Sequence, residues 1–171
     1  MTLVYVLVGG WPASGKSTLA SALAAELEIA LLSKDAIKEA LMDALGAPAS
    51  VEDSRRLGVA AVHVLLRAAR DVPGAVIDST WFDYTKPLVA RLAGTCVEVR
   101  CDAPLATVRA RFDARSRDER HLDSLRSVEE LWGSPVAPLG VGPLIDVDTS
   151  RPVDIPALAD RVRTEAALQD L

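Results

Sequence analysis

Residues Gly10–Ser17 read GWPASGKS and match the pattern G-x-x-x-x-G-K-[ST] at every fixed position. The apolar run LVYVLV at 3–8 precedes this stretch, and a helix-forming stretch at 18–27 follows it. A buried strand, a glycine-containing turn and a helix start are the context that a phosphate-binding loop requires. The alternative is a chance glycine-rich turn, but a match in this context is much rarer than a bare match.

The chemistry of polyphosphate binding explains the spacing of this loop. Gly10 and Gly15 allow backbone N–H groups to turn inward, and the following helix N-terminus adds unpaired N–H groups and a positive dipole end. We expect Lys16 to reach the β- and γ-phosphates and the Ser17 hydroxyl to bind Mg²⁺, so ATP and Mg²⁺ are the predicted cofactors. The predicted nucleotide contacts of the loop are Gly10, Pro12, Ala13, Ser14, Gly15, Lys16, Ser17 and Thr18.

Length and composition are those of one globular α/β domain over residues 1–171, with half of the residues hydrophobic and a quarter charged. The net charge of -5 makes a long nucleic-acid partner less expected. The N-terminal apolar run is too short for a signal peptide or a membrane span. Cys96 and Cys101 should face opposite sides of one strand and cannot pair there. We therefore expect a cytoplasmic protein without a membrane partner.

Apolar runs alternate with amphipathic stretches, which predicts a three-layer α/β/α fold with a parallel sheet covered by helices. The expected strands are 3–8, 29–32, 75–77, 95–100 and 144–147. The expected helices are 16–28, 36–45, 51–70, 85–92, 104–115, 127–132 and 155–168, with a capping box at Ser127 and Glu130 for the sixth.

Two aspartates come at or just after the ends of expected strands, where the ligand crevice of a parallel sheet lies. Asp35 could accept the proton of an acceptor hydroxyl group, and it is an equally good N-cap for a helix starting at Ala36. Asp78 ends the run at 75–77 and resembles the Walker B carboxylate, which holds Mg²⁺ or its water shell. Both residues are therefore candidates for chemistry on a bound nucleotide.

Aromatic and cationic residues cluster after the third and fourth expected strands. Trp81, Phe82 and Tyr84 fall within four positions, so Trp81 and Phe82 are candidates for a substrate-contacting wall, and ordinary core packing is the alternative. A run of arginines could stabilise charge on the transferring phosphate, or could form a solvated face paired with nearby acids. These arginines are Arg109, Arg111, Arg115, Arg117 and Arg120. Two distant histidines and no Cys–His cluster give no reason to expect a zinc site.

Taken together, these segments resemble P-loop kinases of the AAA_33 type, relatives of zeta toxins, chloramphenicol phosphotransferases and polynucleotide kinases. The segments that carry the resemblance are GGWPASGKST at 9–18, LLSKDAIKEAL at 31–41, VIDST at 76–80, VEVRCDAPLATVRARFDARSRDER at 97–120 and IDVDTSRPVD at 145–154.

The resemblance implies a five-stranded P-loop fold with an arginine-rich lid at about 112–134. It implies that Asp35 activates the acceptor hydroxyl group. It places lid arginines at Arg111 and Arg115, with Arg117 and Arg120 less securely placed. The segment after the fifth strand would border the adenine, through Thr149, Ser150 and Arg151.

The leading hypothesis is an ATP-dependent kinase that phosphorylates an alcohol of a small molecule, such as a nucleoside, a sugar or an antibiotic. The first alternative is a 5′-hydroxyl polynucleotide kinase with the same catalytic residues, which the acidic composition and the lack of an aromatic–basic platform disfavour. The second is a nucleotide-dependent regulatory ATPase. No N/T-K-x-D tetrapeptide for guanine occurs in the chain. A monomer and a dimer are equally compatible with the sequence.

Overall fold

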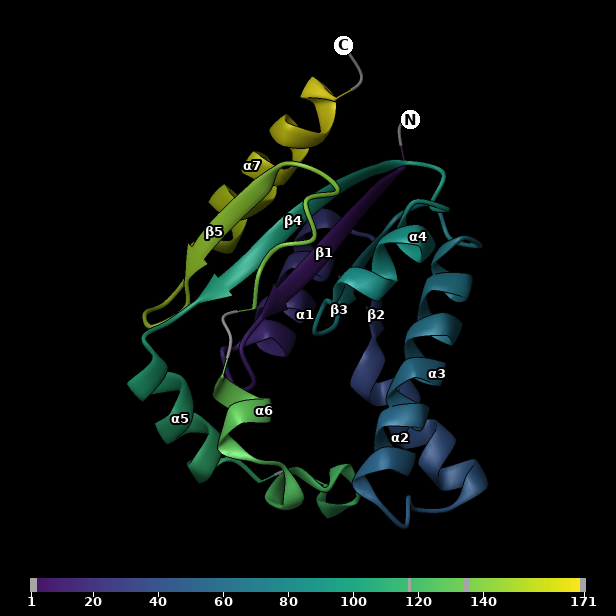
Figure 1. Cartoon of the computed structure of the whole chain (residues 1–171). Coiled ribbons are helices and arrows are strands. Elements are labelled where there is room, and N and C mark those ends of the chain that lie inside the picture. The colour runs from purple at the N-terminus through teal and green to yellow at the C-terminus, as the bar shows by residue number, and fades with distance from the viewer. Residues whose placement is uncertain (1–2, 117, 134–135, 170–171) are drawn as a thin grey trace.

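The computed structural model describes residues 3–116, 118–133 and 136–169. Its centre is one five-stranded parallel sheet, in the order β2-β3-β1-β4-β5 (Figure 1). This confirms the predicted sheet. The strands are β1 Val4–Gly10, β2 Ala30–Ser33, β3 Ala75–Asp78, β4 Thr95–Asp102 and β5 Leu144–Asp148.

Helices cover both faces of the sheet because successive β1 side chains alternate between two hydrophobic clusters. Val6 and Val8 pack with residues of α1 Lys16–Leu27 and α7 Ile155–Leu168. On the other face, the β1 side chains pack with residues of α3 Val51–Ala69 and α4 Lys86–Val89. The three-layer α/β/α architecture predicted from the sequence is therefore confirmed.

The two cysteines also follow the predicted alternation of β4. Cys96 belongs to the cluster that contains α3 residues, whereas Cys101 belongs to the cluster of α1 and α7 residues. Both are free and buried, and burial raises the pKa of Cys96 to about 11 and that of Cys101 to about 12. Both side chains therefore serve as small hydrophobic groups of the core.

Past the carboxyl edge of the sheet, the chain from α5 to α6 crosses to the end of α2 (Figure 1). The helices concerned are α2 Lys34–Leu45, α5 Leu105–Ala114 and α6 Val128–Trp132, with 3₁₀ turns η2 Glu119–His121 and η3 Asp123–Leu125 between the last two. The predicted capping box at Ser127 and Glu130 is present at the start of α6. No helix of the described chain is long and apolar enough to cross a membrane.

Three local predictions differ from the structure. The helix expected at 85–92 is a 3₁₀ turn, η1 Asp83–Thr85, followed by the single turn of α4, after which the chain must reach β4. The first strand continues to Gly10, because Gly9 and Gly10 both pair with residues of β4. The helix expected at 36–45 begins at Lys34, and its N-cap is Ser33, whose Oγ accepts a hydrogen bond from Ala36 N. The interpretation of Asp35 as that N-cap is therefore wrong.

Candidate active site

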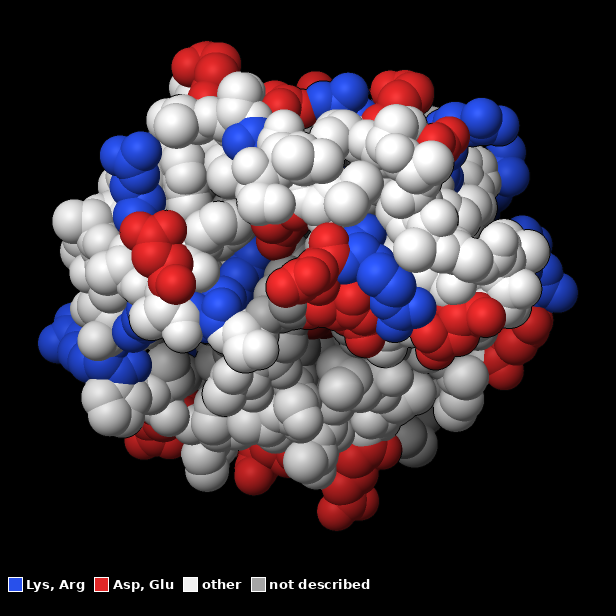
Figure 2. Space-filling model, turned by 90° about the horizontal axis from the view of Figure 1, so that it is seen from below, with Lys and Arg blue, Asp and Glu red and all other residues white. Residues whose placement is uncertain are grey.

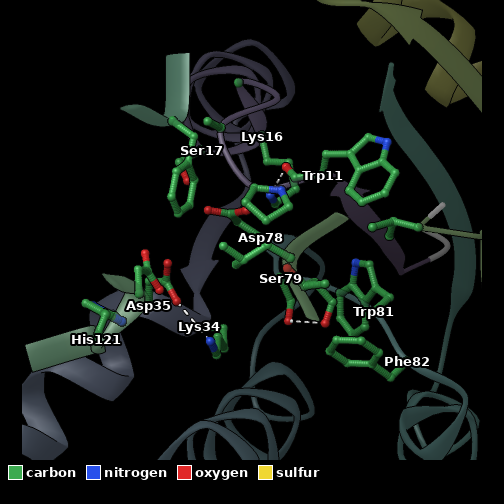
Figure 3. A pocket seen from close by; sticks show the side chains of 18 of the residues that line it. Trp11, Lys16, Ser17, Lys34, Asp35, Asp78, Ser79, Trp81, Phe82 and His121 are labelled. Carbon is green, nitrogen blue, oxygen red and sulfur yellow. Dashed lines mark hydrogen bonds and ion pairs between the residues drawn. The ribbon is translucent and has the colours of Figure 1, made fainter. Parts of the chain in front are cut away.

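A cavity of about 760 Å³ lies at the carboxyl edge of the sheet, where the strand ends converge (Figure 3). It brings together residues from the loop after β1, the start of α2, the end of β3 and the segment from α5 to α6. The predicted site residues that line it are Pro12, Ala13, Gly15, Lys16, Ser17, Thr18, Asp35, Asp78, Trp81, Phe82, Arg111 and Arg115.

The loop between β1 and α1 has the backbone conformation of a phosphate cradle. Gly10 has a φ of 139°, and a Cβ atom there would lie 2.5 Å from the carbonyl oxygen of Cys101. Gly15 has a φ of 91° and occupies the N-cap position of α1, and no side chain of the described residues caps this helix. The first-turn N–H groups of α1 therefore lack a side-chain acceptor and can bind an anion. Ser14 is buried beneath the loop, and its Oγ has no hydrogen-bond partner in the described residues.

Lys16 curves back over this loop, and its Nζ donates a 2.7 Å hydrogen bond to the carbonyl oxygen of Trp11. Desolvation lowers the pKa of Lys16, and the carboxylates of Asp78 and Asp35 oppose that shift. Burial of this ammonium group is unfavourable without an anionic partner, and a phosphate in the loop would supply one. The position of Lys16 therefore suits the phosphate contact predicted from the sequence.

Asp78 ends β3 on the floor of the cavity and accepts a hydrogen bond from the hydroxyl group of Ser17. Burial raises the pKa of Asp78, and the Ser17 hydroxyl and the Lys16 ammonium pull it back down. In the described residues, no group of three or more His, Cys, Asp or Glu side chains could hold a metal ion unaided. The Ser17–Asp78 pair supplies two hard oxygen ligands, which suits Mg²⁺ that is also bound by nucleotide phosphates.

Asp35 lies in the first turn of α2 and reaches toward the same space as Asp78 (Figure 3). Its Oδ1 is 3.0 Å from the Nζ of Lys34, and the Asp35 side chain is 43% exposed. The helix N-terminus favours a carboxylate at this position. Asp35 therefore presents a partly solvated carboxylate to the cavity, opposite the phosphate loop.

The two aromatic residues predicted as a substrate wall lie in different environments. Trp81 is 5% exposed, its Nε1 donates to the carbonyl oxygen of Val8 over 3.0 Å, and its ring packs against Gly9. Phe82 is 56% exposed and stacks on Tyr84, with ring centroids 6.1 Å apart. Trp81 thus supports the cavity wall from the core, whereas Phe82 stands at the edge of the cavity, open to solvent.

Three of the five predicted arginines contact different parts of the structure. Arg111 donates to the carbonyl oxygen of Thr149 over 3.0 Å, so it joins α5 to the segment after β5. Arg115 pairs with Asp123 at 2.8 Å, and its guanidinium group lies 4.2 Å from the centroid of the Phe112 ring. Arg120 instead pairs with Asp118 and Asp43 and does not line the cavity. Arg117 lies outside the described residues.

The predicted adenine-side residues lie beside the cavity and do not line it. Thr149 Oγ1 donates to the carbonyl oxygen of Asp102 over 3.0 Å. Ser150 and Arg151 both bind the carboxylate of Asp148 and are exposed. Of this set, Thr149 lies nearest to the site, through its contact with Arg111.

Sequence reasoning missed a polar network beside Asp35. Lys38 is 1% exposed and donates to Ser54 Oγ over 2.7 Å, and Ser54 Oγ donates to the carbonyl oxygen of His121 over 3.2 Å. The ring of His121, also 1% exposed, lies 2.9 Å from Glu39 Oε1. This network attaches η2 to α2 and α3. The helical spacing of Lys34, Asp35 and Lys38 could have placed them on one face, but no local pattern pairs that face with His121.

An aromatic cluster joins the phosphate loop to α5 and α6. Trp132 lies 5.7 Å from Trp11 and 5.4 Å from Phe112, measured between ring centroids. Arg109 lies over the Trp132 ring at 5.9 Å. The loop residue Trp11 therefore packs against α6, about 120 positions later in the sequence.

Comparison with solved structures agrees with this architecture. A protein from Chloroflexus aurantiacus j-10-fl assigned as a kinase is 29% identical, with a TM-score of 0.81 over 96% of this chain and 99% of its own. The Mycobacterium tuberculosis APS kinase CysC, solved with AMPPNP and APS, is 22% identical, with a TM-score of 0.56 over 95% of this chain and 96% of its own. The fold is thus that of P-loop kinases.

Comparison of sequences gives the family. An uncharacterised protein of Mycobacterium tuberculosis strain H37Rv is 32% identical over 130 residues, which cover 67% of this chain and 26% of the relative. The chain thus spans about a quarter of the length of the curated relatives it matches. The AAA_33 model, described as an AAA domain, matches residues 5–131. This match covers more than half of the chain and includes the phosphate loop, Asp35 and Asp78, so the chain belongs to the AAA_33 family.

Proposed function

We propose that this chain is a phosphotransferase that moves the γ-phosphate of ATP to a hydroxyl group of a small molecule. The observation that carries the proposal is that one cavity of about 760 Å³ is lined by both the phosphate loop and Asp35. A donor site and a candidate base for an acceptor thus share one space. Phosphoryl transfer depends mainly on such positioning and on stabilisation of charge.

The donor side of the cavity would hold Mg-ATP. The loop N–H groups and Lys16 would bind the β- and γ-phosphates, while Ser17 and Asp78 would hold Mg²⁺, which would neutralise charge on the phosphates. The solved APS kinase was crystallised with AMPPNP, an ATP analogue, and shares this fold. Arg111 and Arg115 also line the cavity and could stabilise charge on the transferring group.

On the acceptor side, Asp35 would accept the proton of the attacking hydroxyl group. The acceptor oxygen would form a bond to the γ-phosphorus as the bond between that phosphorus and the β–γ bridging oxygen breaks. The products are ADP and a phosphate ester, and the hydroxyl proton ends on Asp35. Phe82, exposed at the edge of the cavity, would contact an acceptor there.

Surface charge favours a small acceptor over a nucleic-acid end. Figure 2 shows the end of the molecule that carries the lid segment, where acidic and basic side chains lie next to one another around a central hollow. The acidic side chains that line the cavity include Asp123, Glu129 and Glu130. A polynucleotide would be expected to meet a more continuous basic surface.

The proposal is tested by incubating the protein with Mg²⁺ and γ-labelled ATP against a panel of sugars, nucleosides, their phosphates and hydroxylated antibiotics. An oligonucleotide with a 5′-hydroxyl end belongs in the same panel. We expect label transfer to at least one small alcohol and its loss in Lys16→Ala. Transfer to the oligonucleotide alone would favour the polynucleotide kinase. ATP hydrolysis without transfer to any acceptor would favour the regulatory ATPase.

A further inference from the structure

Arg126 is a cavity-lining arginine that the proposed mechanism does not use. It directly follows η3, and its side chain is 25% exposed. The Nε of Arg126 is buried and has no hydrogen-bond partner in the described residues. A buried N–H group without an acceptor costs about 1–3 kcal/mol, so the described residues leave this guanidinium group incompletely satisfied.

Asp123 holds Arg126 beside Arg115. One carboxylate oxygen of Asp123 is 2.8 Å from Arg115 Nη2, whereas the other is 3.7 Å from Arg126 Nε, beyond hydrogen-bonding distance. The three side chains are at most 26% exposed, and all three line the cavity. One carboxylate thus lies between two guanidinium groups in a partly desolvated wall of the cavity.

Two acidic residues of α6, Glu129 and Glu130, also line the cavity. Glu130 is already bound, because its Oε2 accepts from Ser127 N over 2.9 Å and its Oε1 accepts from Arg55. Glu129 also lines the cavity, but it is exposed to solvent, which screens its charge. An anionic ligand group could therefore bind Arg126 with charge-assisted hydrogen bonds.

The cavity wall around these arginines adjoins the acceptor end of the cavity. His121, two residues before Asp123, lies beside Asp35 in Figure 3 and is tied to α2 through Glu39. Lys34 and Lys38, both from α2, also line the cavity. Two lysines of α2 therefore line this end of the cavity together with Asp35.

We infer that Arg126 is the centre of an anion subsite, so that the acceptor is an alcohol that also carries an anionic group: phosphate, sulfate or carboxylate. The part of this inference that makes the ligand a phosphate acceptor with a hydroxyl group rests on the proposed function. The subsite itself rests only on the arrangement of Arg126, Asp123 and Arg115. Arg126 would bind the acceptor and orient its hydroxyl group toward Asp35.

The first experiment measures anion binding without any transfer. Protein saturated with Mg-AMPPNP, which occupies the phosphate loop, is titrated with inorganic sulfate and phosphate in a calorimeter. We expect saturable binding that weakens about tenfold or more in Arg126→Gln and is partly retained in Arg126→Lys. Arg56→Gln, at an exposed arginine of α3, is the matched control and should bind as the wild type does. Equal affinity in Arg126→Gln and wild type would overturn the subsite.

The second experiment compares matched acceptors, such as a sugar with its phosphate and its acid, and a nucleoside with its 5′-phosphate and 5′-sulfate. We expect the anionic member of a pair to have the lower KM, and Arg126→Gln to raise that KM at least tenfold with little change in kcat. The anion that is preferred identifies which group the acceptor carries. Preference for neutral alcohols, unaffected by Arg126→Gln, would overturn the inference and leave the phosphotransferase intact. Anion binding without any phosphate transfer would instead support the subsite and contradict the proposed function.

Discussion

Lys34 Nζ lies 3.0 Å from Asp35 Oδ1, so the candidate base of the site carries its own adjacent cation at the start of α2. The pair sits on the first turn of a helix whose N-cap is Ser33, which fixes the direction in which Asp35 enters the cavity. The pair thus places the Asp35 carboxylate at the cavity, beside a cation from its own helix.

Asp35→Asn keeps the size of this side chain and removes its ability to take a proton. We expect kcat to fall by about 10²–10⁴-fold, because general base catalysis contributes on that order. The dissociation constant for Mg-ATP should change less than threefold, as measured by calorimetry. Asp160→Asn, at an exposed aspartate of α7, is the matched control and should keep full activity. Unchanged kcat in Asp35→Asn would remove Asp35 from the chemistry.

Asp78 is expected to give the site a dependence on pH. Burial raises the pKa of Asp78, so its carboxylate takes up a proton at a higher pH than an exposed aspartate does. Mg²⁺ needs the ionised form, so Mg-dependent nucleotide affinity should fall as the pH is lowered through that raised pKa. In Asp78→Asn the affinity should be weak at every pH and lose this dependence, as titrations with a fluorescent ATP analogue would show.

The same raised pKa has the opposite consequence for stability. The folded state binds the Asp78 proton more tightly than the unfolded state, so this residue contributes stability at low pH and loses it as the pH rises through the folded-state pKa. At neutral pH, Asp78→Asn should therefore stabilise the apo protein by about 1 kcal/mol, or roughly 2–4 °C in Tm. A lower Tm for Asp78→Asn at neutral pH would show that its hydrogen bond from Ser17 outweighs the cost of burial.

Elements with a strong local signal were the ones that could be predicted from the sequence. The phosphate loop, the parallel sheet and α7 follow from glycine spacing, apolar runs and helical periodicity, which are all local properties. The N-cap of α2 was difficult to predict because Ser33 and Asp35 are both good caps and only Lys34 separates them. The capping preferences of the two residues could not decide between them. The pairing of β2 with β3 does, because it places Ser33 opposite Asp78 at the end of the strand.

The missed part of the site is formed by contacts distant in sequence. Arg126 belongs to a segment with no regular period, and its relation to Asp123 and Arg115 depends on two 3₁₀ turns. Glu98 reads as an ordinary polar residue of a strand, yet it is 4% exposed. Its partners come more than forty positions later. No single-sequence pattern encodes such pairings.

The aromatic cluster around Trp132 leads to a prediction about motion of α5 and α6. Its contacts with Trp11 and Phe112 join α6 to the phosphate loop and to α5. Trp132→Ala should weaken that connection by about 1–1.5 kcal/mol, which corresponds to about tenfold faster amide exchange in residues 105–132. Trp132→Phe keeps an aromatic ring and should exchange at a rate close to that of wild type. Equal exchange in Trp132→Ala and wild type would show that the cluster does not hold the segment.

Glu98 should be a structural carboxylate whose loss lowers stability. It lies within β4, and its two oxygens accept hydrogen bonds from the backbone N–H groups of Leu139 at 2.6 Å and Val141 at 2.7 Å. Glu98→Ala leaves both N–H groups without this acceptor, so the free energy of unfolding should fall by about 3 kcal/mol in urea titrations. Glu98→Gln keeps one acceptor oxygen and should lose about half as much, while Glu26→Ala on the exposed face of α1 should change little.

Because Leu139 and its neighbour Pro138 line the cavity, Glu98→Ala should also weaken acceptor binding while Mg-AMPPNP binding persists. A loss of nucleotide affinity as large as that for the acceptor would mean that Glu98 supports the whole fold and not this wall of the cavity.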